Sequence, residues 1–166
     1  MEESTISLTI AVVALIVALF SLLRPPKKEK KSAVEEFNAV PLQLQAYERL
    51  VLLTERISLP NLISRLNQPN ISAKEMQVHF IEAIKQEYEY NASQQIYVSP
   101  IAWEAVRNLR DQNMLIINQV AGLVPNDASG NDLAKKILEV IMQQQDAALH
   151  TIVLNAINFE AKKLMQ

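Results

Sequence analysis

The hydrophobic pattern begins with a long apolar run near the N-terminus. No charged residue occurs in 4–23, and the centre of this run, 10–20, is entirely apolar. At about 1.5 Å of rise per residue, a helix over this run is roughly 30 Å long, the thickness of the hydrocarbon core of a bilayer. A cleaved signal peptide would begin with basic residues, whereas this run follows Glu2 and Glu3. The pattern therefore predicts a transmembrane helix over 4–23.

The distribution of basic residues predicts the orientation of that helix. None precedes the apolar run, and five follow it within residues 24–36, a stretch that also contains Pro25 and Pro26. Because basic segments stay on the cytoplasmic side, we expect a short N-terminus outside and the rest of the chain in the cytoplasm. Residues 24–36 are predicted to be a linker. Its candidate contacts to lipid headgroups are Arg24, Lys27, Lys28, Lys30 and Lys31.

Beyond the linker, apolar residues recur with helical spacing. The first such stretch begins at Pro41 and is broken by Pro60, with a short continuation over 61–66. The second begins at a capping box, Ser72 with Glu75, in which each side chain can bond the backbone N–H of the other residue. Its inward-facing residues recur every four positions: Met76, Phe80, Ile84 and Tyr88.

Two further helices complete the pattern. Ser99 and Pro100 begin the third, which ends near Gly122. The fourth is predicted to run from about 131 almost to the C-terminus, although two glutamines near 144 interrupt its apolar stripe. Four such helices with short connections bury their stripes most simply as an antiparallel bundle. The predicted fold class is all-α, a transmembrane helix followed by a cytoplasmic four-helix bundle over 37–166.

Composition narrows the chemistry. The 166 residues include no Cys, so cysteine-based catalysis and cysteine metal sites are excluded, and with only 2 Gly, turn-rich sandwiches and barrels fit poorly. Neither His79 nor His150 follows a Glu at the three-residue spacing of a carboxylate metal site in a bundle. A net charge of −2 argues against nucleic acid as a partner. We therefore predict no catalytic, metal-binding or cofactor-binding residue and no cofactor.

A repeated charge pair marks the first helix of the bundle. Glu48 and Arg49 recur seven residues later as Glu55 and Arg56, so two rows of like charge follow an otherwise apolar helix. These rows are either solvated side chains flanking the core or partners in ion pairs with another helix or another protein.

The connection after the second helix is rich in tyrosine and amides. Ile96, Tyr97 and Val98 are too few to build a sheet and predict an extended connector. The tyrosines either form a recognition surface or anchor the connector through their hydroxyls. Trp103, in the following helix, is predicted to lie in the core.

These motifs together resemble a known but uncharacterised family. The segments 42–49, 55–57, 86–91 and 94–99 ahead of Trp103 resemble a domain-of-unknown-function family of small, membrane-anchored helical proteins from Bacteroidota. The resemblance implies a bacterial inner-membrane protein and supplies no catalytic residue. It draws attention to a candidate packing or docking face made by Tyr47, Glu48, Arg49, Glu55, Arg56, Gln94, Gln95, Tyr97 and Trp103.

The prediction for function is a membrane-tethered interaction or scaffold module on the cytoplasmic face. Its expected partners are the lipid bilayer and a protein or a second copy of the chain. One alternative is a membrane-organising homo-oligomer that uses the long C-terminal helix. Another is an enzyme or small-ligand binder, for which Glu48, Arg49, His79 or His150 would gather in one cavity.

Overall fold

The computed structural model describes residues 38–68, 70–144 and 147–166. The predicted membrane span over 4–23 and the basic linker over 24–36, with its candidate headgroup contacts, lie outside these residues. Within the described ranges, none of the helices combines the length and the apolar character that crossing a bilayer requires. Asn38–Gln166 forms one compact unit.

The described residues form six α-helices and one short 3₁₀ helix, without a β-strand. The prediction of an all-helical chain is thus confirmed, but the predicted number of four helices in the domain is wrong. The α-helices are α2 (Val40–Ile57), α3 (Leu59–Leu66), α4 (Ala73–Tyr90), α5 (Pro100–Ala121), α6 (Gly130–Gln144) and α7 (Ala147–Lys163), and the 3₁₀ helix is η1 (Ala92–Ile96).

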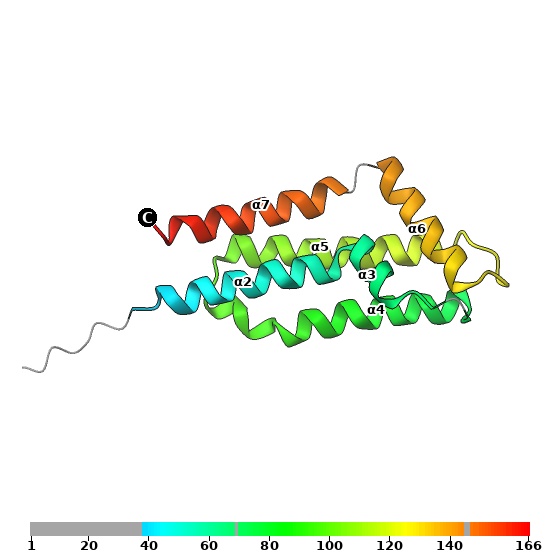
Figure 1. Ribbon diagram of the computed structural model, residues 1–166, viewed down its shortest axis with the longest axis horizontal. Helices are drawn as coiled ribbons and strands as arrows, with labels where there is room; N and C mark the ends of the chain where they lie inside the picture. The colour runs from blue at the N-terminus through cyan, green and yellow to red at the C-terminus, as the bar shows by residue number, and fades with distance from the viewer. Residues whose placement is uncertain (1–37, 69, 145–146) are drawn as a thin grey trace, which may run out of the picture. The chain divides into compact units, whose positions relative to one another are not determined.

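The four long helices α2, α4, α5 and α7 lie side by side, and each runs opposite to the one before it (Figure 1). α2 packs against α7 and α4, and α5 packs against α4 and α7. The shorter α3 and α6 lie toward the end of the domain remote from the start of α2 (Figure 1). There α6 contacts α3, α4 and α5, and it leads the chain from α5 to α7.

All six α-helices contribute to one hydrophobic core. Of the stripe predicted on α4, Met76, Phe80 and Ile84 are fully buried and Tyr88 is partly buried. Side chains of this size each contribute about 1.5–3 kcal/mol when they leave water. Fully buried residues of the other helices include Leu50, Leu53, Leu62, Leu109, Ile117, Leu133, Ile137 and Ile157.

Local signals set most helix boundaries. The capping box at the start of α4 is confirmed: the Ser72 backbone N–H donates to Glu75 Oε2 at 2.9 Å, and the Glu75 N–H donates to Ser72 Oγ at 3.2 Å. The Ser99 side chain likewise caps α5 by accepting from the Ala102 N–H. Pro60 lies in the first turn of α3, a position where its missing N–H costs nothing.

A second reciprocal cap, absent from the sequence prediction, begins α6. The Ser129 N–H donates to Asp132 Oδ2 at 3.0 Å, and the Asp132 N–H donates to Ser129 Oγ at 3.2 Å. The starts of α4 and α6 are joined by two backbone hydrogen bonds, from Ala73 N to Ala128 O and from Gly130 N to Ile71 O. A Cβ on Gly130 would lie 3.0 Å from the Gln68 carbonyl oxygen, so a side chain there would fit only if the neighbouring backbone shifted.

The two caps predict an acid-sensitive stability. Hydrogen bonds from Ser72 and Ser129 lower the pKa values of Glu75 and Asp132, respectively. A carboxyl with a lower pKa in the folded state stabilises the fold above its unfolded pKa, about 4.3 for Glu and 3.9 for Asp, and this stabilisation is lost as the pH falls through the folded value. We expect the melting temperature of the domain, followed by circular dichroism, to fall between about pH 5 and pH 3.

A double variant tests whether the two caps cause this fall in melting temperature. Glu75→Gln with Asp132→Asn should melt below the parent at pH 7, and the gap should narrow at about pH 3. Glu82→Gln is the matched control, since Glu82 is an exposed residue of α4 without a hydrogen bond or ion pair to the described residues. A double variant that melts with the same pH dependence as the parent would contradict the assignment.

Two connections differ from the sequence prediction. The predicted extended connector at Ile96, Tyr97 and Val98 is instead the end of η1 and a turn, because backbone bonds such as Gln94 N to Asn91 O and Tyr97 N to Gln94 O close tight turns there. The predicted single C-terminal helix is two helices, of which α6 ends at Gln144 and α7 begins at Ala147. α7 lies along α2 and α5, whereas α6 packs mainly on α4.

Candidate functional site

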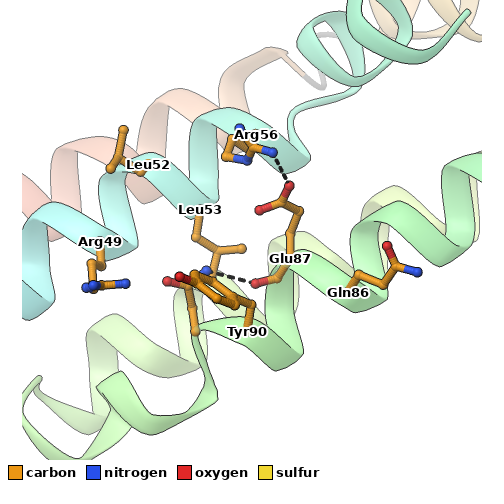
Figure 2. Close-up of a pocket in the computed structure, with 8 residues that line it drawn as sticks. Arg49, Leu52, Leu53, Arg56, Gln86, Glu87 and Tyr90 are labelled. Carbon is orange, nitrogen blue, oxygen red and sulfur yellow. Dashed lines mark hydrogen bonds and ion pairs between the residues drawn. The ribbon is translucent and has the colours of Figure 1, made fainter.

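An open cleft lies between α2 and α4. Its volume is about 470 Å³. Figure 2 shows arginines from α2 and Glu87 and Tyr90 from α4 along its two sides. The lining residues are Arg49, Leu52, Leu53, Arg56, Gln86, Glu87, Tyr90 and Asn91.

Helical spacing brings these residues to one surface. On α2 the lining positions are 49, 52, 53 and 56, and on α4 they are 86, 87 and 90, with Asn91 just after the end of the helix. Residues three, four and seven apart share one face of a helix. The spacing of seven residues between the two charge pairs therefore places Arg49 and Arg56 on the cleft side of α2.

One of the two cleft arginines is neutralised by α4. Arg56 Nη2 lies 2.5 Å from Glu87 Oε1, and this bond and the charge of Glu87 raise the pKa of Arg56. Arg65, from α3, is a second cation near the same carboxylate, with Nη1 at 3.5 Å. Arg65 Nη2 also donates to the Arg56 carbonyl at 3.2 Å. The side chain of Glu87 is only 16% exposed, so this arrangement fixes α2, α3 and α4 together.

The other cleft arginine, Arg49, is available to bind a ligand. It forms no hydrogen bond or ion pair with any residue that the structure describes. Two apolar side chains stand exposed beside it, Leu52 at 61% and Tyr90 at 75%, over a floor that includes the fully buried Leu53. The lining of the cleft contains two arginines, Arg49 and Arg56, and one carboxylate, Glu87, so it has a positive excess. The cleft can thus bind a carboxylate next to an apolar group.

Comparison with protein families matches residues 2–164 to a family of unknown function, DUF7935. The chain belongs to DUF7935. This confirms the expectation of an uncharacterised family, and the match includes the predicted membrane span as well as the helical domain. No curated protein and no solved structure matches the chain. The function of this DUF7935 chain is unknown, so it has to be argued from the geometry of its surface.

Two residues of the predicted face anchor the DUF7935 domain internally. Tyr47 is buried, and its hydroxyl accepts the Ser99 backbone N–H at 3.0 Å, which ties α2 to the start of α5. Trp103 is partly buried, and its ring lies 5.0 Å from that of Tyr88. The guanidinium of Arg110 lies 4.1 Å above the other ring of this pair, Tyr88, at a distance typical of cation–π attraction.

The remaining predicted residues are spread over other surfaces. Glu48 is exposed on α2 and does not line the cleft. Glu55 accepts from Asn61 Nδ2 at 3.0 Å, at the junction with α3. Gln94 and Gln95, in η1, and Tyr97, just beyond it, also lie outside the cleft. The structure thus brings Arg49 and Arg56 together and distributes the rest of the predicted face.

A smaller cavity lies where α2 ends, and sequence reasoning did not find it. Its volume is about 160 Å³. His150 lines it, with Nε2 3.4 Å from Glu55 Oε2. Asn113 also lines it, and its Nδ2 donates to the Ile57 carbonyl at 2.7 Å. The lining residues are Ser58, Leu59, Pro60, Leu109, Asn113, Ile141, His150 and Thr151.

The polar cluster expected of an enzyme does not form in either cavity. Arg49 lines the α2–α4 cleft and His150 lines the smaller cavity, while Glu48 and His79 line neither. Among the residues that the structure describes, no group of three or more metal-ligating side chains is placed to hold an ion.

Proposed function

We propose that this DUF7935 chain is a single-pass protein of a bacterial inner membrane. Its N-terminus lies outside, and its helical domain is a cytoplasmic interaction or scaffold module. Support for the anchor comes from the charge-free run over 4–23 and from the basic residues that follow it. The anchor holds the domain in a thin layer beside the membrane, which raises its effective concentration toward other membrane proteins.

The observation that carries the interaction role is the α2–α4 cleft. Arginine and tyrosine are enriched among the residues that dominate binding energy at protein interfaces. Arg49 and Tyr90 lie at this cleft with the exposed Leu52. The partner is a protein segment that inserts an apolar side chain and presents a carboxylate to Arg49. Glu87 is occupied by Arg56 and Arg65, so the carboxylate for Arg49 must come from the partner.

The experiment is site-specific photo-cross-linking in cells that produce the tagged, full-length protein. A photoreactive residue at position 52 should capture a membrane protein, identified by mass spectrometry. The control position is 115, an exposed leucine on α5. A chain that lacks residues 1–37 should lose the product because the domain is no longer held at the membrane.

Charge reversal at Arg49 tests the chemistry of the cleft. Arg49→Glu should reduce the yield of the position-52 product at least about tenfold, because it replaces attraction by repulsion. Arg107→Glu, on exposed α5 surface, should leave it unchanged. An unchanged yield in Arg49→Glu contradicts the proposed cleft, and a product that contains only two copies of this chain favours the homo-oligomer instead.

A further inference from the structure

Exposed apolar side chains gather at one end of the helical domain. This end contains the start of α2, the connection from α4 to α5 and the end of α7 (Figure 1). Three of the large, exposed apolar side chains among the described residues are aromatic, and all three lie at this end. The exposed apolar residues of this end are Leu42, Tyr90, Ile96, Tyr97, Ile101, Phe159 and Met165.

A hydrogen bond and helix packing hold these segments together. Ser99, at the start of α5, donates its backbone N–H to the Tyr47 hydroxyl of α2. α7 packs against both α2 and α5. η1 packs against both α2 and α4. The exposed side chains therefore lie on segments that are held together at this end of the domain.

The same end is where the chain enters the domain. α2 begins at Val40, and the predicted membrane span ends at residue 23. Residues 24–37, even fully extended, reach no more than about 50 Å, and α5 alone is roughly 33 Å long. A linker of this length holds the start of α2 within about 50 Å of the end of the predicted span, whereas the far end of the domain can lie farther away by the length of a helix.

The chemistry of the surface fits the membrane–water interface. Tyrosine and phenylalanine place apolar rings among lipid chains, and tyrosine also keeps its hydroxyl near the headgroups. Lys163 lies at the end of α7 with its Nζ 4.4 Å from the ring of Phe159. The same ammonium pairs with Glu160 at 2.8 Å, so these two charges offset each other. Apolar insertion, more than attraction to anionic lipid, is the expected source of affinity.

We infer that this end of the domain is a membrane-contact surface, which docks on the cytoplasmic interface of the bilayer that holds the anchor. The inference rests on the proposed membrane anchor. Arg49 lies only nine residues, about 13 Å, beyond the start of α2. Docking therefore holds the α2–α4 cleft beside the membrane, where the segment that it binds is a juxtamembrane part of another protein.

Two matched positions, one at the start of α5 and one just beyond its end, test the inference. Ile101 is the second residue of α5 and Leu123 lies two residues after its last residue, and they are 72% and 71% exposed. Because the natural chain has no cysteine, Ile101→Cys and Leu123→Cys each give one labelling site for an environment-sensitive fluorophore. The full-length variants are reconstituted in phosphatidylcholine–phosphatidylglycerol vesicles, with and without lipids that carry a spin-label quencher.

The label at position 101 should shift its emission to the blue and be quenched at least about twofold more than the label at 123, at low and at high salt, since apolar contacts are not screened. Equal quenching at both positions, or none at 101, overturns the inference. A blue shift at 101 that needs a high protein-to-lipid ratio and occurs without lipid quenching also overturns it, in favour of a second copy of the chain. Release of the protein from the vesicles by alkaline carbonate would instead refute the anchor.

Discussion

Replacing Phe80 by alanine should lower the free energy of unfolding of the helical domain by about 3–5 kcal/mol. Phe80 is fully buried and lies on α4, which packs against α2, α5 and α6. Removing its ring loses the transfer free energy of the buried atoms and leaves a cavity that three neighbouring helices cannot fill without moving. Urea denaturation of the fragment 38–166, followed by circular dichroism, measures the change.

Val78→Ala is the control on the same helix. Val78 precedes Phe80 by two residues, and its side chain is 45% exposed, so we expect a change within about 0.5 kcal/mol. The contrast directly tests whether the apolar residues at every fourth position of α4 form its buried face. Equal losses in the two variants would mean that Phe80 is not part of the core.

The boundaries of most helices could be predicted because their causes are local. Ser72 and Glu75 bond each other across three residues, and Ser99 with Pro100 begins α5 in the same local way. The equivalent pair Ser129 and Asp132 carried the same signal and was missed, since aspartate takes the place of the usual glutamate.

The packing of the shorter elements could not be predicted in this way. The sequence predicted a single helix over α6 and α7 because the apolar stripe resumes after the glutamines. The separation of the two helices depends instead on what each of them packs against. The contact between the starts of α4 and α6 joins Ile71 to Gly130, two positions whose proximity no sequence spacing encodes. The 3₁₀ helix η1 depends in the same way on its contacts with α2 and α4.

The α2 side of the cleft could be predicted from the sequence. Spacing by seven predicted that Arg49 and Arg56 share a face of one helix, and both line the cleft. The partner of Arg56 is Glu87, on another helix, and Arg65 joins them from α3. These contacts depend on tertiary packing, so the sequence left open whether the arginines are paired or free. In the structure, Arg56 is paired, whereas Arg49 lacks a partner among the described residues.

Asn113 links the stability of the domain to the cleft. It is buried, and its Nδ2 donates to the Ile57 carbonyl at 2.7 Å. Ile57 is the last residue of α2, and α3 begins two residues later, so the amide satisfies a carbonyl that the end of a helix leaves unpaired. The position of α3 matters for the cleft because Arg65, on this helix, contacts Glu87 and the Arg56 carbonyl.

Asn113→Ala should therefore destabilise the domain by about 1–3 kcal/mol, the cost of leaving a buried carbonyl without its donor. Asn108→Ala, at an exposed position of the same helix, should change the free energy of unfolding by less than about 0.5 kcal/mol. Urea denaturation of 38–166 compares the two. Because the junction of α2 and α3 loosens first, the Asn113 variant should also lose hydrogen-exchange protection in α3 ahead of α5. Uniform loss of protection across both helices would show that Asn113 supports the core as a whole and has no particular role in placing Arg65.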